Sequence, residues 1–351
     1  MRLSPRRPLS WMCPQFDRLK SWGVCMKAVL VIHGGAGAIS RAAMSTEKER
    51  DYHAALNEIL LAGQAVLAQG GTALDAVTTA VVGLEDCPLF NAGRGAVFTS
   101  EGTHELDASI MDGATLKTGA IANVHHVRNP VRAARKVMEE SRHVFFVGEG
   151  AERFAREHGL EMVERAYFST PERYEQLLRV QRENPNAAVL DHDGQAMVAK
   201  QMSAQAHPLD MDKKFGTVGA VALDIHGNLA AATSTGGITN KQVGRVGDAP
   251  IIGAGCYASN QTCAVSTTGT GEMYIRKVAA YDISARMRYA GASLKEASDA
   301  VMFEELPSIG GKGGLIAVDA LGNFVLPFNT GGMYRGYARV AQKPVTAIYA
   351  D

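Results

Sequence analysis

The 351-residue sequence has no excess of charge of either sign, no long apolar run and no cysteine framework. Lys plus Arg and Asp plus Glu each number 36, so the formal net charge is zero. This balance gives no support for nucleic acid or a charged membrane surface as the main partner. The clearest apolar run, AVLVI at 28–32, has the length of a strand and not the roughly 18 residues of a membrane span. The five cysteines include no Cys-x-x-Cys pair, which favours free thiols in a reducing cytoplasm over disulfides or a zinc cluster.

The first 25 residues differ in composition from the rest. They contain five basic residues against one acidic residue, Asp17, for a net charge of +4. They lack the apolar core of a secretory signal, and strand-like sequence begins abruptly at Met26. We therefore expect residues 1–25 to be a disordered extension, or Met26 to be the working start; a transit peptide is the alternative.

From Met26 onward, predicted strands alternate with predicted helices. The apolar segment 27–32 predicts a buried strand that ends in the glycine-rich segment HGGAGA, and 87–96 has too many turn residues for regular structure. Capping signals at Thr46–Glu49, Thr72–Asp75 and Ser293–Glu296 predict three helix starts. We expect helices at about 46–68, 72–85, 130–141, 149–159, 171–183, 271–290 and 294–305.

Two further segments, 218–234 and 314–329, each consist of two apolar runs around a Gly-Asn turn. This pattern predicts two buried antiparallel hairpins rich in small residues. Helices that cover two sheets packed on each other would form an α+β body of four layers in the order α-β-β-α.

The segment 184–216 has no sustained periodicity, and a loop of this length is unusual within a compact domain. We interpret it as a flexible linker or as a segment near a processing point. Thr217 follows Gly216 where this segment meets a predicted strand. If the bond between them were cut, the freed α-amine, with a pKa near 8, would be able to act as general base for the Thr217 hydroxyl. Without that context, a threonine at the start of a strand is most often only a β-former.

Two other glycine-rich segments compete as functional loops. HGGAGA at 33–38 follows a strand, but Ser40 stands where a dinucleotide-binding fingerprint has its third glycine, and the Gly-Lys-Ser/Thr ending of a phosphate-binding loop is missing. The segment 232–236 approaches the nucleophile elbow of a serine esterase, but Ala232 replaces its first glycine. Ser234 is therefore a poor candidate nucleophile.

A threonine nucleophile needs an oxyanion stabiliser and a substrate anchor. The segments 232–237 and 266–272 supply hydroxyl groups and accessible backbone N–H groups. Arg245 and Asp248 place one cation and one anion close together, which matches the carboxylate and ammonium of a free amino acid. Taken singly, such segments are also typical of turns and surface ion pairs.

In combination, these segments resemble the plant-type L-asparaginase / isoaspartyl aminopeptidase (β-aspartyl-peptidase) family of N-terminal-nucleophile hydrolases, in its bacterial form. The resemblance spans 26 to about 340 and implies one domain with the four-layer fold of those hydrolases. The matching segments, in family order, are HGGAGAIS, EDCPLFNAGRGAVFT, HELDASIMDG, GTVGAVALD, ATSTGG, GRVGD, TGTGE, and GGLIAVD through PFNTGGMYR.

The resemblance also implies a mechanism. The chain would cleave itself between Gly216 and Thr217, giving an α subunit (26–216) and a β subunit (217–351), with Thr217 as the nucleophile. The remaining implied roles are assistance by Thr235, an oxyanion hole at Thr268 and Gly269, Asn91 close to the nucleophile, and Arg245 and Asp248 on the substrate's aspartyl carboxylate and ammonium, with Gly271 nearby.

The resemblance implies no organic cofactor but a structural sodium ion held by main-chain oxygens, a ligand type that suits a hard cation. Its implied substrates are β-aspartyl dipeptides and asparagine, and its implied assembly is a cytoplasmic homodimer of αβ heterodimers without nucleic acid or membrane. The implied sodium ligands are the main-chain oxygens of Leu84, Glu85, Cys87, Phe90, Ala92 and Arg94.

Two alternatives belong to the same family: glycosylasparaginase, which usually has a secretory signal and disulfides, and a taspase-like protease. A third, of a different class, is an inactive homologue that only binds. Such a homologue would be expected to have lost Thr217, Arg245 or Asp248, and all three are present.

Overall fold

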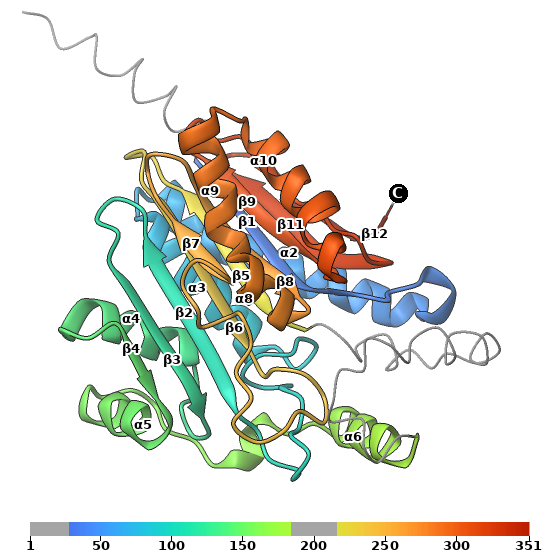
Figure 1. The fold of residues 1–351 in the computed structure, drawn as a ribbon. Coiled ribbons are helices and arrows are strands. Elements are labelled where there is room, and N and C mark those ends of the chain that lie inside the picture. The colour runs from blue at the N-terminus through green and yellow to red at the C-terminus, as the bar shows by residue number, and fades with distance from the viewer. Residues whose placement is uncertain (1–27, 184–215, 351) are drawn as a thin grey trace, which may run out of the picture.

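The computed structural model describes residues 28–183 and 216–350 (Figure 1). The expected basic extension at 1–25 and the expected linker, apart from Gly216, lie outside these residues. Within the described ranges no helix combines the length and the apolar composition needed to cross a bilayer. Cys87, Cys256 and Cys263 are free thiols there.

The described residues form a large, mainly antiparallel sheet with the strand order β12-β11-β1-β5-β6-β2-β3-β4. The central strand β5 directly follows Thr217, and β1 and β6 lie on either side of it. Strands β3 and β4 pair in parallel. The strands are β1 (Val29–Gly37), β2 (Leu106–Asp112), β3 (Thr118–Val124), β4 (Phe145–Val147), β5 (Val218–Leu223), β6 (Leu229–Thr235), β11 (Gly332–Arg339) and β12 (Val345–Tyr349).

A smaller sheet packs face to face on the large one. Its order in the described residues is β10-β9-β8-β7, and all of its pairings are antiparallel. A dry cluster that includes Val31, Val221 and Ile316 fills the space between the two sheets. The strands are β7 (Cys256–Ala258), β8 (Cys263–Gly269), β9 (Gly313–Asp319) and β10 (Phe324–Val325).

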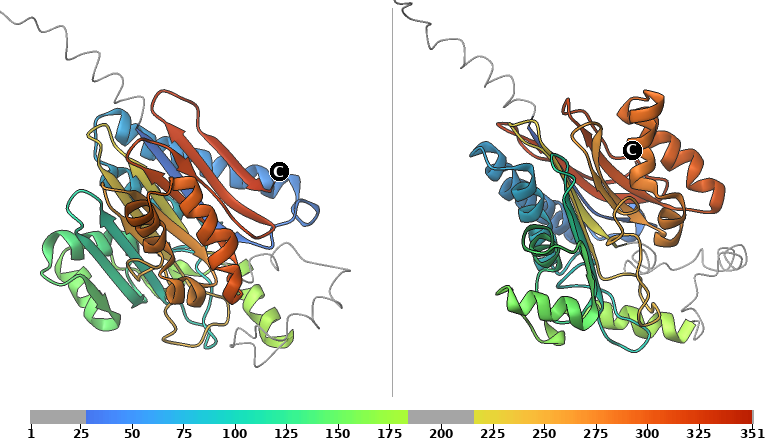
Figure 2. Two further views of the ribbon diagram at one scale, coloured as in Figure 1. Left: turned by 45° about the horizontal axis from the view of Figure 1, so that its top comes forward. Right: turned by 60° about the vertical axis from the view of Figure 1, so that its left-hand side comes forward.

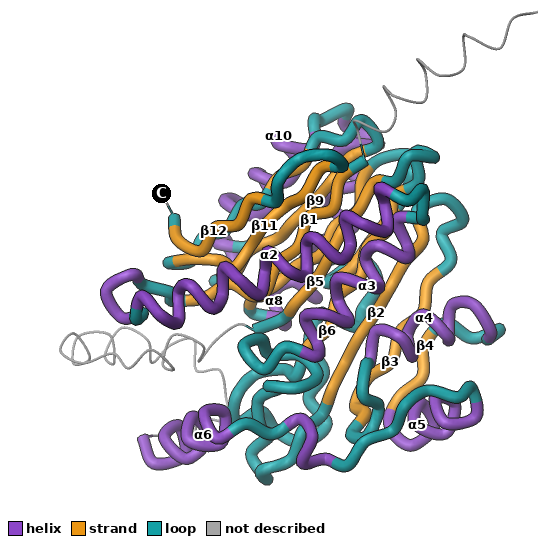
Figure 3. Tube along the Cα trace, turned by 180° about the vertical axis from the view of Figure 1, so that it is seen from behind, coloured by secondary structure: helices purple, strands orange, loops and turns teal. Residues whose placement is uncertain are grey.

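Helices cover the outer face of each sheet, so the body has four layers (Figure 2, right). Figure 3 shows the helices that lie across the large sheet: α2 (Thr46–Ala68), α3 (Ala73–Asp86), α4 (Pro130–Glu140) and α5 (Gly148–Glu157). The small sheet is covered by α8 (Gly271–Lys277), α9 (Ala279–Ala290) and α10 (Leu294–Ala300), and α6 (Pro171–Glu183) precedes the undescribed segment. Short helical turns are η1 (Arg41–Ala43), η2 (Arg165–Phe168), η4 (Val301–Glu305) and η5 (Pro307–Ile309). The predicted α-β-β-α architecture is confirmed.

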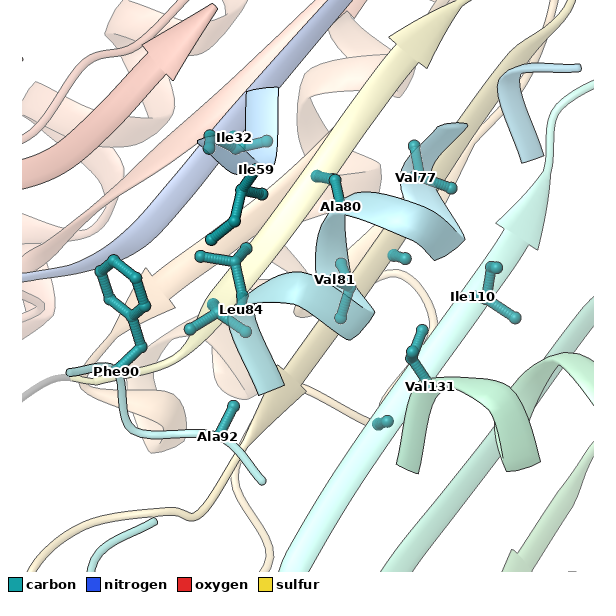
Figure 4. Packing of buried hydrophobic residues seen from close by; sticks show 14 of the residues in the cluster. Ile32, Ile59, Val77, Ala80, Val81, Leu84, Phe90, Ala92, Ile110 and Val131 are labelled. Atoms are coloured by element: carbon teal, nitrogen blue, oxygen red, sulfur yellow. The ribbon is translucent and has the colours of Figure 1, made fainter. Parts of the chain in front are cut away.

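The apolar run of β1 is continuous because both faces of this strand are buried. Val29 and Val31 belong to the cluster between the sheets, whereas Leu30 and Ile32 belong to the cluster under the helices. Side chains alternate between the two faces of a strand, so burial on both sides requires an unbroken apolar sequence. Figure 4 shows the helix-side cluster, in which α3 packs among its neighbours.

The capping predictions hold at Thr72 and Ser293, whose side chains accept hydrogen bonds from the backbone N–H groups of Asp75 and Glu296. The prediction at Thr46 is wrong by one residue. Ser45 is the N-cap of α2, because its hydroxyl accepts from the Lys48 N–H at 3.2 Å.

Three expected boundaries also differ. The helix predicted at 271–290 breaks at Val278 (φ 50°), because the first N–H groups of α9 donate instead to the carbonyls of Gly253 and Ala254. The strand predicted to end at Ile32 continues to Gly37, because β11 pairs along it. The last run of the second hairpin stops at Val325, before Pro327, which has no N–H to donate to a ladder.

Candidate active site

Sheet register places Thr217 beside Thr235. Strands β5 and β6 pair Val218 with Ser234, so the residue before β5 lies opposite the last residue of β6. The Thr217 hydroxyl donates to the Thr235 hydroxyl oxygen over 3.3 Å. Both side chains are buried, with residue exposures of 7% and 3%. The two threonines, which we call the nucleophile pair, are thus positioned by the backbone of two central strands.

Asn91, in the loop after α3, hydrogen-bonds to Gly237, whose backbone N–H in turn bonds to Thr235 of this pair. Its Nδ2 donates to the Gly237 carbonyl at 2.7 Å, and its Oδ1 accepts from the Val97 N–H at 2.8 Å. The Gly237 N–H in turn donates to the Thr235 hydroxyl oxygen at 3.0 Å. A Cβ on Gly216 would lie only 2.4 Å from the Asn91 Cβ. Close packing therefore requires glycine immediately before Thr217.

Arg245 and Asp248 line the same pocket as the nucleophile pair, and we call them the clamp. Nε and Nη2 of Arg245 donate to the two carboxylate oxygens of Glu272, each over 2.9 Å. Asp248 instead accepts from the Thr267 hydroxyl at 2.7 Å. A Cβ on Gly271 would lie 2.9 Å from Asp248 Oδ1 and 3.0 Å from Arg245 Nη2. The two clamp charges thus approach the same glycine, each held by a different partner.

Asp248 is buried in a way that favours a positively charged partner. Burial raises the pKa of its carboxyl to about 6, although the Thr267 hydrogen bond and the Arg245 charge act in the opposite direction. A buried carboxylate gains free energy from a cation that reaches it. An incoming ammonium group meets this requirement.

Strand β8 brings the expected oxyanion residues to the pocket. Gly269, the last residue of β8, lines it together with Thr217. The neighbouring Thr268 hydroxyl accepts a long hydrogen bond of 3.4 Å from the Ala36 N–H at the end of β1. Hydroxyl and backbone groups of this kind, fixed in a strand, are preorganised hydrogen-bond donors.

The pocket collects residues that are far apart in the sequence. Asn91 and Gly271 contact residues that line it, and Thr268 immediately precedes the lining residue Gly269 in β8. A larger cavity, of about 260 Å³ and beside the Arg128–Glu161 ion pair, contains none of the residues predicted to carry chemistry. The residues that line the smaller pocket are Gly216, Thr217, Thr235, Gly237, Ile238, Arg245, Gly247, Asp248 and Gly269.

The loop after α3 packs closely against main-chain carbonyl oxygens at Gly93 and Gly95. A Cβ on Gly93 (φ 51°) would lie 2.4 Å from the Glu85 oxygen, which also accepts from the Arg94 N–H at 2.7 Å. A Cβ on Gly95 (φ 98°) would lie 2.8 Å from the Phe90 oxygen. Two of the predicted sodium ligands, the carbonyls of Glu85 and Phe90, therefore line a tight backbone turn. This arrangement fits a cation held by main-chain oxygens.

Comparison with known proteins identifies the family. A sequence model of the asparaginase family matches residues 26–348. The chain belongs to the asparaginase family. It is 59% identical over 325 residues to the isoaspartyl peptidases of Escherichia coli and Salmonella typhimurium, covering 93% of this chain and 97% and 99% of those proteins. It is 41% identical over 309 residues to the human isoaspartyl peptidase/L-asparaginase, covering 88% of this chain and 92% of that protein. The predicted family is confirmed.

In this member of the asparaginase family, the structure adds two residues that sequence reasoning did not place at the site. His33, interpreted only as part of a turn, lies in β1 with its Nε2 2.9 Å from the Ser266 hydroxyl, and burial lowers its pKa to about 3. In the sequence, Glu272 is only the last residue of the glycine-rich segment 266–272, and no role was predicted for it. Its pairing with Arg245 has no local sequence signal, because the two residues lie on different elements.

Proposed function

We propose that this protein hydrolyses β-aspartyl dipeptides and the side-chain amide of asparagine, as an isoaspartyl peptidase and L-asparaginase. The observation that carries the proposal is that a hydrogen-bonded threonine pair and an Arg–Asp clamp line the same pocket. Membership of the asparaginase family supports it, and so does the high identity to relatives named isoaspartyl peptidase.

The proposed active form arises by cleavage of the bond between Gly216 and Thr217. The Thr217 hydroxyl adds to the Gly216 carbonyl, the C–N bond breaks, and water hydrolyses the resulting ester. The products are a carboxylate on Gly216 and a free α-amine on Thr217. The absence of room for a Cβ on Gly216 supports a backbone that is closely fitted at this bond.

In substrate hydrolysis, the Thr217 amine takes the proton of its own hydroxyl. The hydroxyl oxygen attacks the β-carbonyl of the substrate, and Thr268 and Gly269 donate to the oxygen that becomes negative. The proton passes to the leaving amine as the C–N bond breaks, and water then releases aspartate from the Thr217 ester. In the uncut chain the Thr217 hydroxyl donates to Thr235; once the amine has taken this proton, the Thr235 hydroxyl would donate to the Thr217 oxygen and so assist the attack.

The clamp accounts for hydrolysis of an amide formed by the β-carbonyl of the aspartyl part. Arg245 would bind the α-carboxylate of the aspartyl part, exchanging its present partner Glu272 for the substrate. Asp248 would bind the ammonium next to Gly271. With both α-substituents held, the β-carbonyl remains free to reach Thr217, whereas in an α-aspartyl peptide the α-carboxylate is already part of the peptide bond.

For the loop after α3 we propose a structural sodium ion. Leu84 and Glu85 at the end of α3, together with Cys87, Phe90, Ala92 and Arg94, would supply main-chain oxygens. The bound ion would supply charge that holds these carbonyls together. Because Asn91 belongs to the same loop and bonds to Gly237 behind the nucleophile pair, an ordered loop keeps the site in place. The proposed hydrolysis itself uses groups of the chain and no organic cofactor.

We further propose a cytoplasmic homodimer of cleaved αβ units that acts on small molecules, neither nucleic acid nor membrane. This assembly is supported by the family resemblance. Light scattering on purified protein should return the mass of two full chains, and the mass of a single αβ unit would contradict it.

The test of the proposed function compares two dipeptides of identical composition, β-Asp-Leu and α-Asp-Leu. The wild-type protein should release leucine from the β-linked peptide and leave the α-linked one essentially intact, because only the former presents a free α-carboxylate to Arg245. Equal turnover of both would remove the clamp from the mechanism. It would also contradict the isoaspartyl assignment and favour a less selective protease.

A further inference from the structure

A buried ion pair contacts the loop that carries Arg245 (242–247), which we call the clamp loop. Nζ of Lys241 lies 3.4 Å from Oε2 of Glu105, and the two side chains are 2% and 1% exposed. Lys241 Nζ also donates to the Glu105 backbone carbonyl at 3.1 Å. Neither residue lines the pocket. Placing two charges in the interior costs solvation free energy. The other contacts of the two side chains therefore indicate what role the pair has.

Glu105 is bonded to the clamp loop itself. Both of its carboxylate oxygens accept from the Gly244 N–H, at 2.9 and 3.1 Å. Gly244 (φ 85°) immediately precedes Arg245. One carboxylate thus holds a backbone amide next to the clamp arginine and, at the same time, an ammonium at the start of the same loop. The loop has no regular structure between 242 and 247, so these side-chain bonds limit where its backbone lies.

Lys241 also touches the backbone behind the nucleophile pair. A Cβ on Gly237 (φ 89°) would lie 2.7 Å from Lys241 Cδ and 2.9 Å from its Nζ. The Gly237 N–H bonds to Thr235 and its carbonyl to Asn91. The lysine stem therefore packs against Gly237 while its ammonium pairs with Glu105.

A second buried carboxylate, that of Asp107, interacts electrostatically with Lys241. Asp107 lies two residues after Glu105 and is opposite Thr235 in the register of β2 and β6. Its Oδ1 accepts from the Asn123 N–H at 2.8 Å, while burial raises its pKa and the charges of Lys241 and Arg245 lower it. Lys241 thus lies in a field set by two acidic groups from the chain before Thr217.

We propose that Lys241 and Glu105 are positioning residues that set the distance between the Arg245 clamp and the nucleophile pair, and so determine recognition of the substrate's α-carboxylate. This inference rests on the proposed function. After cleavage at Gly216–Thr217 the two residues would belong to different subunits. The pair would then be a buried ionic contact that keeps the β-subunit clamp loop registered on the α subunit.

The test uses Glu105→Gln and Lys241→Met, assayed on asparagine and on asparagine α-amide, whose α-carboxylate is replaced by a neutral amide. If the pair positions Arg245, each variant should lower kcat/KM for asparagine by about ten- to a hundredfold, mainly through KM. The α-amide, which offers Arg245 no carboxylate, should lose far less. Equal losses on both substrates would show a merely structural role and overturn the proposal.

A double-mutant cycle sharpens this result. In an Arg245→Met background, Glu105→Gln should change kcat/KM for asparagine by less than about twofold, because the group it positions is gone. Full additivity of the two changes would contradict the proposal.

A single variant leaves one buried charge without its partner and can fail to fold, whereas the double variant Glu105→Gln/Lys241→Met leaves neither charge. It should fold and show the same loss of preference for the α-carboxylate, and an unchanged preference overturns the proposal.

Arg286→Met is the matched control. Arg286 on α9 also links two acidic groups, Asp282 and Glu305, at 3.0 and 2.8 Å, but it lies on the helices over the small sheet. The Arg286→Met variant should prefer asparagine over asparagine α-amide to the same degree as the wild type. A change in this preference like that of Glu105→Gln would overturn the proposal. Wild-type protein that hydrolyses neither of these substrates nor β-Asp-Leu would overturn the proposed function itself. Wild-type activity with equal losses in the variants would overturn only the positioning role.

Discussion

The nucleophile pair and the clamp line one pocket, but different interactions position them. Thr217 and Thr235 lie at paired ends of β5 and β6, where the ladder of a central sheet fixes the backbone. Arg245 lies in a loop without regular structure. Its side chain pairs with Glu272, and the N–H of the preceding Gly244 donates to Glu105, which also forms an ion pair with Lys241. The positions of the two threonines are therefore fixed by the register of β5 and β6, whereas the position of the clamp loop depends on individual side-chain contacts.

Removing the nucleophile should have the largest effect. Thr217→Ala should remain a single chain and hydrolyse neither asparagine nor β-Asp-Leu, because the hydroxyl that breaks both bonds is absent. A denaturing gel and an ammonia-release assay measure the two losses. Thr217→Ser, which keeps a hydroxyl, is the control and should still be cut. A Thr217→Ala protein with wild-type turnover would contradict the assigned nucleophile.

Removing the clamp arginine should separate recognition from cleavage. A charge-assisted contact of this kind contributes about 1.5–3 kcal/mol, so Arg245→Ala should lower kcat/KM for asparagine by roughly ten- to a hundredfold. Self-cleavage needs no free amino-acid head, so the variant should still be cut at Gly216–Thr217. Loss of cleavage in a folded variant would show that the clamp and the nucleophile pair are not independent.

The raised pKa of Asp248, about 6, gives the clamp a pH signature. Above this pKa the carboxylate is ionised and can bind the substrate ammonium; below it, the charge is lost. The ratio of kcat/KM for asparagine to that for succinamate, which lacks the ammonium, should therefore fall as the pH decreases through about 6. Effects on Thr217 cancel in this ratio.

Asp248→Asn provides the control for that signature, because it removes the titrating group without changing the size of the side chain. Its substrate ratio should be low and independent of pH between about 5 and 8, where the substrate carboxylates stay ionised. A ratio in the wild type that does not change with pH would mean that Asp248 does not bind the ammonium.

The smallest expected effect concerns the loop that carries Asn91. Sodium that binds the folded state should raise the melting temperature in sodium chloride over that in choline chloride, by roughly 5 °C at saturation. Gly95→Ala, which forces a Cβ against the Phe90 carbonyl, should lower the melting temperature and remove this difference. Equal melting in both salts for the wild type would contradict the sodium proposal.

Local sequence signals predicted much of the fold and indicated Thr217 as a candidate nucleophile, whereas the role of Thr235 was implied only by the family resemblance. Caps at Thr72 and Ser293, the apolar run of β1 and the Gly-Asn hairpin of β5 and β6 each depend on neighbours close in sequence. Arg245 and Asp248 were indicated by a cation and an anion close together in one glycine-rich segment. Such signals suffice where a residue's position follows from the element that contains it.

What the sequence could not predict are contacts between distant segments. Glu105 and Lys241 are 136 positions apart, and neither residue type in its local context indicates a buried pair. Likewise, the break at Val278 depends on carbonyls of Gly253 and Ala254 that bond to α9 only in the folded state. Partner choice of this kind is set by tertiary packing, so motifs gave the clamp residues but not what positions them.

The central claim is that Thr217 becomes an N-terminal nucleophile, and mass spectrometry of the purified, denatured wild-type protein tests it most directly. The account predicts two chains whose masses correspond to a break between Gly216 and Thr217, with hydrolytic activity that appears in step with the cut form. A fully active protein that remains one uncut chain would contradict it.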